Sequence, residues 1–496
     1  MTCRNRGREQ PEVLSWTDVT VAVGNRSPLA GRRYHGPMSP QRLLLAVGLP
    51  AGLLVALLLP PWTGYDEFSH YSRAVDIASG SLIPEESTRG TGSLIPTAYV
   101  EGTDLVILNY RAGRNPINWV HVRDLMELRP DGREVFVDTR ATAASTPVAY
   151  LPAVAGMAIP VAAKAPGIVV LWAGRLASLA VYLALAWIAV RTAARFRWTL
   201  TIAALVPLNL TLAGSVSPDG LTIAALLCMV SIWTRVEDGE DPPLGWMVTA
   251  FLLLALAKPP YFLALAVFPA SLLAGRTAAR LRSVTWATGA LAIGLLSSLI
   301  NSSQNYRAVT FSLIGSSDYQ PKIQAGRLFG DLPGFVFNAA QTWFLEIGDY
   351  VPEWFRQLGS WESGLPAGLA WLLLAVMVVA AAHLDSADYL RSTGFTRGLL
   401  SMGTVGTLFV LYGSSYVYFS DRTDYQGIGI QMARYSIPLI ALALIGWAPR
   451  WLVARLPAQQ AGSEKAAVGS VAVVVGVALG FSVVTWLVTG DEIPFG

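Results

Sequence analysis

Cysteine is almost absent from this chain of 496 residues, and so are the short motifs that mark many soluble enzymes. The two cysteines are Cys3, in a polar N-terminal segment, and Cys228, inside an apolar run, so no disulfide framework is available. The sequence contains no GxGxxG fingerprint, Walker loop, HExxH motif or CxxC pair. These absences leave cytosolic nucleotide chemistry without support and imply that the exposed loops are held by packing and by a membrane.

Charged residues are also scarce. They make up 14% of the chain, compared with about 25% in an average soluble domain, while 53% of the residues are hydrophobic. Lysine is nearly absent, and arginine supplies most of the positive charge, a bias typical of GC-rich genomes such as those of actinobacteria. The composition predicts one all-α polytopic membrane domain rather than several soluble domains.

Apolar runs predict how often the chain crosses the membrane, because a crossing helix needs about 20 mostly apolar residues. Eleven spans are expected within a single transmembrane domain over residues 42–490, although the pair around AKPPY is short and could be one broken helix. The expected spans are residues 42–61, 167–190, 198–214, 220–235, 243–257, 260–275, 283–300, 365–383, 397–413, 435–449 and 467–489. The polar, Arg-rich residues 1–41 lack the layout of a signal peptide and are expected to form a disordered cytoplasmic tail.

The arginines of the connecting loops predict the orientation, because cytoplasmic loops carry an excess of Lys and Arg. If residues 147–166 stay on the outer face, the connections RTAARFRW, GRTAARLR, YLRSTGFTR and APRWLVARL all become cytoplasmic. Three prolines and Lys164 also disfavour a crossing by that segment. We therefore expect a multi-pass plasma-membrane protein whose first extracytoplasmic loop, residues 62–166, ends in a juxtamembrane helix. Further outer loops are expected at residues 301–364 and 414–434.

In this topology, unusual polarity gathers on the extracytoplasmic side. The stretch PPWTGYDEFSHY follows the first span and brings Asp66 and Glu67 just outside the membrane. Arg175, Asp219, Lys258 and Arg434 are expected near the outer ends of other spans. Because an ionisable group at a helix centre in the membrane costs about 2.5 to 3.5 kcal/mol, six such groups on one side predict a pocket there.

Most of these residues also have an interpretation that involves no ligand. Asp66 and Glu67 could simply begin the helix EFSHYSRAVDIASG, since carboxylates are favourable in a first helical turn. Arg175 and Lys258 could extend to the membrane interface, and Asp219 could belong to the N-cap region of the next span.

The sequence resembles one bacterial family over nearly its whole length. PPWTGYDEFSHYSRAVDIASG, TPVAYLP, WAGRLASLAVYLALAWIAVR, SVSPDGLTIAALL, KPPYF and QMARYSIPLI occur in the order and spacing of the predicted membrane proteins catalogued as domain of unknown function 2142. The pattern departs at the turn before Asp66, which is longer and lacks an earlier acid, and at Ala433, where glycine is expected. More distantly, the topology resembles the GT-C glycosyltransferases, which place an acidic residue in the first extracytoplasmic loop, followed by a juxtamembrane helix.

The GT-C resemblance implies transfer of a sugar, with inversion, from a polyprenyl-phosphate donor to a cell-envelope glycan or lipid acceptor on the extracytoplasmic face. In that interpretation Asp66 is the general base and Glu67 is its partner or a ligand. The candidates for binding substrate or phosphate are His70, Arg73, Arg175, Asp219, Lys258 and Arg434. Because Asp66, Glu67 and His70 would share one helical face, they could also hold a divalent cation, Mg²⁺ or Mn²⁺.

Three other functions remain open. A transporter or flippase of a lipid-linked glycan would need ionisable residues near the bilayer midplane and paired repeats; no repeat is obvious, but the KPP between two short spans keeps the possibility open. A glycan ligase or polymerase would differ only in the size of its donor. A non-catalytic envelope-assembly subunit would use the long outer loops as an interaction surface. No interpretation includes a nucleic-acid partner.

Overall fold

Long apolar helices dominate the computed structural model, which describes residues 38–87, 90–103, 119–139, 142, 145–312, 321–358, 361–362, 364–419, 432–448, 450–456 and 460–488. Seven helices of this part are long and apolar enough to cross a membrane by length and composition. They are α1 (Pro40–Leu58), α6 (Gly167–Thr192), α9 (Asp219–Glu237), α12 (Ala278–Ser312), α15 (Ala367–Leu384), α17 (Gly394–Phe419) and α21 (Ala461–Val488). The expected all-α membrane architecture is confirmed at this level.

Four of the expected spans are short or interrupted. The expected span 198–214 is divided into α7 (Arg197–Ala204) and α8 (Pro207–Ala213). The expected span 243–257 is the short helix α10 (Leu244–Ala257). The expected span 260–275 consists of η1 (Tyr261–Ala266), α11 (Val267–Ser271) and η2 (Leu272–Ala274). The expected span 435–449 consists of α18 (Met432–Ser436), η3 (Ile437–Leu439) and α19 (Ile440–Trp447).

Prolines explain two of these interruptions. Val206 is extended, with φ −58° and ψ 131°, because Pro207 disfavours helical geometry at the residue before it. One continuous helix over residues 198–214 therefore does not form. Lys258, which precedes Pro259, is extended as well, so α10 and η1 are separate segments.

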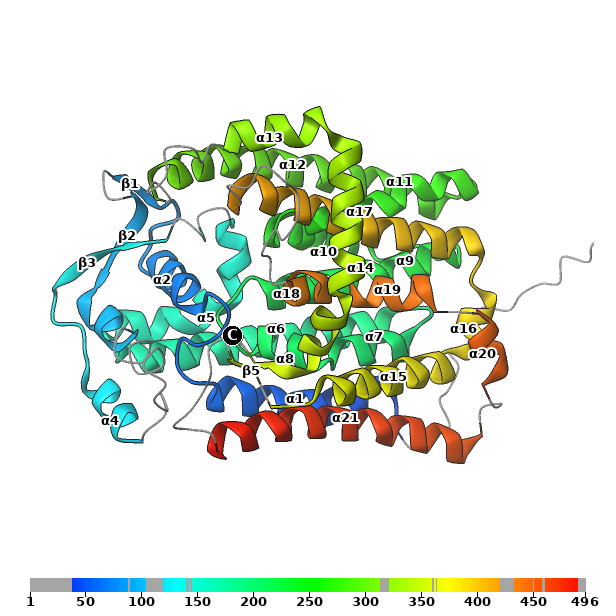
Figure 1. Ribbon diagram of the computed structural model, residues 1–496, viewed down its shortest axis with the longest axis horizontal. Helices are drawn as coiled ribbons and strands as arrows, with labels where there is room; N and C mark the ends of the chain where they lie inside the picture. Colours follow the sequence, from blue (N-terminus) through cyan, green and yellow to red (C-terminus); the bar gives the residue numbers. More distant parts are fainter. Residues whose placement is uncertain are drawn as a thin grey trace, which may run out of the picture.

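The connection between α1 and α6 builds a small subregion with its own core. An antiparallel sheet of β1 (Glu85–Ser87), β2 (Gly90–Pro96) and β3 (Glu134–Asp138) packs with α2 (Glu67–Ala78) and lies near α4 (Trp119–Glu127) at the left of Figure 1. Its buried aromatic side chains, which include Trp62, Tyr71 and Tyr99, form a second hydrophobic cluster with the first turns of α6. We call this end of the bundle the α2 end and the opposite end, which carries α16 (Ser386–Arg391) and α20 (Arg450–Arg455), the α16 end.

Helix α5 (Pro147–Ala162) stays at the α2 end instead of running the length of the bundle. At its start Thr146 donates a hydrogen bond to the carbonyl of Leu256, near the end of α10, at 2.6 Å. Helix α5 leads into α6, whose first residue, Gly167, accepts a hydrogen bond from the hydroxyl of Tyr71 in α2 at 3.2 Å. Along the hairpin, a Cβ at Gly156 would lie 2.2 Å from the carbonyl oxygen of Ala173, so glycine permits the close approach of the two helices.

The segment after α12 contributes a helix that crosses the bundle. It comprises α13 (Pro321–Gly330), α14 (Leu332–Arg356) and a short hairpin of β4 (Gln357–Leu358) and β5 (Trp361–Glu362). Figure 1 shows α14 running across the other helices instead of along them. Trp343 packs against Phe409 of α17, with ring centroids 4.9 Å apart, and Trp354 donates to the hydroxyl of Ser436 in α18 at 3.3 Å.

The Arg-rich connections meet at the α16 end. Arg195 pairs with Asp238 at 3.0 Å, and Arg280 pairs with Glu237 at 3.2 Å. Glu237 also accepts a hydrogen bond from Thr396 at 2.9 Å. The chain therefore brings three distant connections to the same end, as their shared sidedness predicted.

Two aspartates, Asp385 just before α16 and Asp388 within it, cap the buried helix α7 from another part of the chain. Asp385 Oδ2 accepts hydrogen bonds from the backbone N–H of Thr199 at 2.7 Å and from its hydroxyl at 2.8 Å. Asp388 accepts a hydrogen bond from the backbone N–H of Phe196 at 3.1 Å. The first N–H groups of a helix have no partner within the helix, so these carboxylates supply acceptors that α7 itself lacks.

Asp385→Ala is expected to lower the free energy of unfolding by about 1–2 kcal/mol, the usual cost of a lost N-cap, and Asp385→Asn by less because its amide oxygen still accepts. The midpoint of thermal unfolding in detergent measures both losses.

Burial, and then the nearby charge of Asp388, raises the pKa of Asp385 to about 7 from an ordinary 3.8. The folded protein thus holds a proton that the unfolded chain releases, so stability should fall as the pH rises from about 4 to about 7. Thermal unfolding in detergent across this range tests the slope, which should flatten in Asp385→Asn. An unchanged slope in that variant would contradict the assignment.

Candidate functional site

The candidate site begins where the chain leaves α1 and enters α2. Asp66 directly precedes α2 in the left-handed region, with φ 51° and ψ 21°, which is uncommon for a residue other than glycine. Its side chain makes no capping hydrogen bond to the helix, and it is 64% exposed. Asp66 Oδ2 instead accepts a hydrogen bond from Arg434 Nη1 at 2.6 Å. Asp66 and Glu67 do begin α2, as the sequence allowed, but the Asp66 side chain is directed to Arg434 and not to an N–H group of the helix.

Arg434 joins Asp66 to a second carboxylate that is fully buried. Asp219, the first residue of α9, accepts a hydrogen bond from Arg434 Nε at 2.8 Å and from the hydroxyl of Ser217 at 2.9 Å. Its other oxygen is paired with the ammonium group of Lys258 at the end of α10. Residues from α2, α9, α10 and α18 thus meet in one cluster of alternating charge, which we call the ion cluster: Asp66, Asp219, Lys258 and Arg434.

His70 supports Arg434 from the side. Its Nε2 lies 3.3 Å from Arg434 Nη2, and its Nδ1 lies 2.8 Å from the hydroxyl of Tyr150 in α5. A guanidinium group can only donate hydrogen bonds, so Nε2 accepts and the ring proton belongs on Nδ1. Burial, with the nearby charge of Arg434, lowers the pKa of His70 from 6.5 to about 3, so the ring is neutral at physiological pH.

The charges around Asp66 set its protonation state. Partial desolvation acts to raise the pKa of the Asp66 carboxyl, but the positive charges of Arg434 and Lys258 outweigh it and hold the pKa below its ordinary value. In this arrangement Asp66 is a carboxylate open to solvent and held beside a buried cation.

Glu67 and Arg175 form a separate pair immediately next to the ion cluster. Both side chains are fully buried, and Arg175 reaches the two carboxylate oxygens at 2.8 and 2.5 Å. Glu67 also accepts hydrogen bonds from the backbone N–H groups of Gly64 at 3.1 Å and Val216 at 2.9 Å. This carboxylate accepts four hydrogen bonds and has no exposed surface.

Arg175 also fixes the end of α1. Its guanidinium donates to the carbonyl oxygens of Leu59 at 2.6 Å and Pro60 at 2.9 Å, and to that of Ala56 at 3.2 Å. These carbonyls lie in the last turn of α1 and just beyond it, where helical partners are missing. The pair therefore ties α1, the start of α2 and α6 together beneath Asp66.

Tyrosines complete the surroundings of the cations. The Arg434 guanidinium lies 5.3 Å from the ring centroid of Tyr65 and 5.8 Å from that of Tyr435, and Lys258 Nζ lies 4.7 Å from the Tyr435 ring. Sequence reasoning missed Tyr65, Tyr150 and Tyr435. Two of them could have been found, because Tyr65 and Tyr435 are chain neighbours of Asp66 and Arg434.

The eight residues predicted from the sequence therefore separate into three groups. Asp66, His70, Asp219, Lys258 and Arg434 come together, and Glu67 with Arg175 adjoins them as a closed pair. Arg73 is directed elsewhere: it pairs with Asp76 and donates to the carbonyls of Ser81 and Leu82 beyond the end of α2.

The residues suggested as ligands of a divalent cation do not fit one. Glu67 is directed to Arg175, and both ring nitrogens of His70 have partners in Tyr150 and Arg434. Within the described ranges, no group of three His, Cys, Asp or Glu side chains is placed to hold a metal ion.

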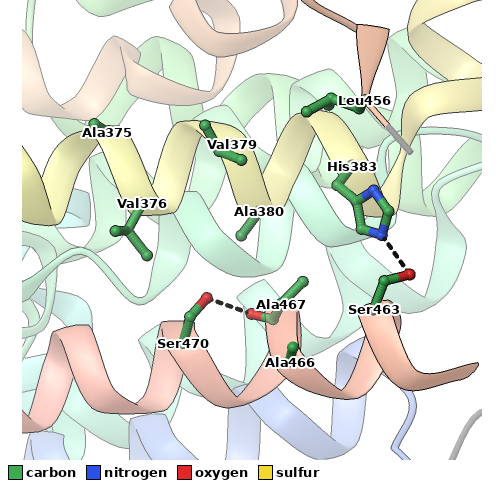
Figure 2. Close-up of a pocket in the computed structure, with 10 residues that line it drawn as sticks. All are labelled: Ala375, Val376, Val379, Ala380, His383, Leu456, Ser463, Ala466, Ala467 and Ser470. Carbon is green, nitrogen blue, oxygen red and sulfur yellow. Dashed lines mark hydrogen bonds between the residues drawn. The ribbon is translucent and has the colours of Figure 1, made fainter. Parts of the chain in front are cut away.

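A cavity of about 400 Å³ lies apart from the ion cluster, between α15 and α21. Figure 2 shows small apolar side chains such as Ala380 and Ala467 along it, with His383 bonded to Ser463 at 3.1 Å at one end. Among the described residues that line this cavity, His383 is the only one with a titratable side chain other than the hydroxyl-bearing serines.

Comparison with known families matches residues 49–443 to the family described as "Predicted membrane protein (DUF2142)". The matched range runs from within α1 to within α19 and contains all eight predicted site residues. No curated protein matches the chain.

Proposed function

The chain belongs to the DUF2142 family of predicted membrane proteins, and from this premise we propose that it is a glycosyltransferase of the cell envelope. It transfers a sugar from a polyprenyl-phosphate donor to a glycan or lipid acceptor on the extracytoplasmic side. The observation that carries the proposal is the contact of Arg434 with Asp66. It sets an exposed carboxylate beside a buried arginine, close to the half-buried Lys258, at one end of a bundle of membrane helices.

The topology that goes with this function is GT-C-like, with eleven crossings. The seven long helices supply seven of them, and the four short or interrupted segments, α7–α8, α10, η1–α11–η2 and α18–η3–α19, supply the others. The Arg-rich α16 end is then cytoplasmic, together with the N-terminus, and the α2 end is extracytoplasmic.

The chemistry divides between the carboxylate and the cations. Asp66 takes the proton of the acceptor hydroxyl, whose oxygen attacks the anomeric carbon of the donor sugar as the bond to the lipid phosphate breaks. Lys258 and Arg434 stabilise the negative charge that collects on the departing phosphate. The planar guanidinium of arginine can donate two parallel hydrogen bonds to two phosphate oxygens. The displacement inverts the anomeric centre.

Glu67 and Arg175 act through position in this proposal. Their side chains are fully buried and bonded to each other, so contact with substrate is left to Asp66, Lys258 and Arg434. The pair instead fixes the turn that presents Asp66, which is its neighbour in the chain.

Purified protein in lipid nanodiscs, supplied with a short-chain polyprenyl-phosphate sugar and an envelope glycan acceptor, tests the proposal. Nanodiscs enclose no compartment, so no gradient can drive the reaction, and a glycosylated product would identify an enzyme. Movement of the lipid-linked sugar across sealed vesicles, without any new glycosidic bond, would instead identify a transporter or flippase. The interrupted helix α7–α8 favours that second candidate, because transporters often use broken helices, but the ion cluster lies at helix ends rather than at mid-helix.

A further inference from the structure

Both cations of the resting ion cluster are already paired with carboxylates in the part of the chain that the structure describes: Lys258 with Asp219, and Arg434 with both Asp219 and Asp66. We propose that Asp66 occupies the anion-binding position on Arg434, and that the phosphate of the lipid-linked donor displaces it on binding. This inference rests on the proposed function, and it adds a ligand-exchange step that couples donor binding to activation of the base.

The charges of the ion cluster sum to zero. Asp66 and Asp219 contribute two negative charges, Lys258 and Arg434 contribute two positive charges, and His70 is neutral. The neighbouring pair of Glu67 and Arg175 is also balanced. A phosphate that enters this cluster therefore gains a strong contact with Arg434 only if a carboxylate leaves.

The two carboxylates differ in how easily they can leave. Asp219 has no exposed side-chain surface and is held by Arg434, Lys258 and Ser217, so removing it would leave the buried Arg434 and the half-buried Lys258 without this partner. Asp66 is 64% exposed and is bonded to Arg434 through Oδ2. Water can solvate the released Asp66 carboxylate, whereas a released Asp219 would be a buried charge without a partner. Asp66 is therefore the carboxylate that the phosphate displaces.

The departure of Asp66 prepares it for catalysis. The positive charge of Arg434 lowers the pKa of Asp66 in the resting state, which makes the carboxylate a weak base. Once a phosphate pairs with the guanidinium, the charge of Arg434 is neutralised and the pKa of the Asp66 carboxyl rises again. The base then becomes effective only when the donor is present, which suits a site where the acceptor hydroxyl competes with water.

Binding measurements on the full chain in nanodiscs test the exchange, with farnesyl phosphate as the lipid probe and inorganic phosphate as the headgroup alone. Asp66→Ala removes the competing carboxylate, so it should bind farnesyl phosphate at least about fivefold more tightly than the unmodified protein. Asp66→Asn should show a smaller gain, because its amide oxygen can still accept from Arg434. Since Asp66 is exposed, both variants should fold, and the asparagine variant carries the test if the alanine variant does not.

Asp131→Ala is the matched control. Asp131 is also an exposed aspartate paired with an arginine, Arg133, at 2.6 Å, but that pair lies in the outer turn before β3. Its loss should leave the affinity unchanged. Equal or weaker binding by both Asp66 variants would overturn the exchange, and so would an equal gain in Asp131→Ala. A gain for inorganic phosphate as well as farnesyl phosphate would identify the headgroup as the competing anion, whereas a gain with farnesol would contradict it.

The outcomes separate this inference from the proposed function. Tighter binding by Asp66→Ala without any sugar transfer by the unmodified protein would retain the exchange and remove the glycosyltransferase. Sugar transfer without a change in affinity would do the reverse.

Discussion

Replacing Asp66 with asparagine is expected to lower the kcat of sugar transfer by about 10² to 10⁴-fold while leaving the fold intact. The amide has the same size and can still accept the hydrogen bond from Arg434, but it cannot take a proton from the acceptor hydroxyl. The side chain is 64% exposed, so little packing depends on it. Initial rates with purified protein in nanodiscs, together with thermal unfolding of both proteins, measure the two halves of this prediction.

Asp131→Asn is the control for that variant, because it makes the same chemical change in another exposed aspartate that is paired with an arginine. It should transfer sugar at the normal rate. Normal turnover by Asp66→Asn would mean that another group is the base, and a loss of folding in Asp66→Asn would mean that the carboxylate is structural.

The pH dependence of the rate offers a second view of the same carboxylate. The lowered pKa of Asp66 and the pKa of His70 near 3 predict that neither group changes charge between about pH 5 and 8 in the free enzyme. The acid limb of kcat/KM should therefore lie below this range, and the limb of kcat should lie higher if the donor frees Asp66 from Arg434. A limb of kcat/KM near pH 6.5 that His70→Gln removes would show that His70 titrates during the reaction.

The meeting of distant charges was accessible from the sequence, whereas their pairing was not. The expected orientation of the helices alone predicted that Asp219, Lys258 and Arg434 lie on the same side of the helix bundle. The structure brings their side chains into contact. The sequence assigned different roles to Asp66 and Glu67 but not different partners. The left-handed backbone at Asp66 directs the two adjacent carboxylates apart, to Arg434 and to Arg175. What the cluster binds stays a prediction.

Other differences have equally local causes. Pro207 interrupts the expected span of residues 198–214, because a hydropathy window averages across a single proline. The break before Pro259 falls between two expected spans. Arg73 has the charge and the neighbourhood expected of a phosphate ligand, yet its position one turn from the end of α2 leads it to Asp76 and the following carbonyls. Tyr150 is a single tyrosine in an apolar helix, and its hydrogen bond to His70 depends on how α5 packs, which no periodicity reveals.

Breaking the buried pair beneath the site should have the largest effect on stability. Glu67→Met or Arg175→Met alone is expected to lower the free energy of unfolding by about 3–5 kcal/mol, because each leaves an uncompensated charge where no water reaches. The midpoint of unfolding in detergent measures the loss. Arg133→Met, which removes one partner of an exposed pair, should change stability by no more than about 1 kcal/mol.

The double variant Glu67→Met/Arg175→Met separates the charge effect from the rest. Replacing both charges with apolar side chains removes the stranded ion, so part of the lost stability should return. The recovery should be incomplete, because the carbonyls of Ala56, Leu59 and Pro60 lose the donor that Arg175 supplies. Additive losses in the double variant would show that the two side chains act independently. A stable double variant with poor sugar transfer would show that the pair positions Asp66, since the turn that presents this carboxylate is fixed at Glu67.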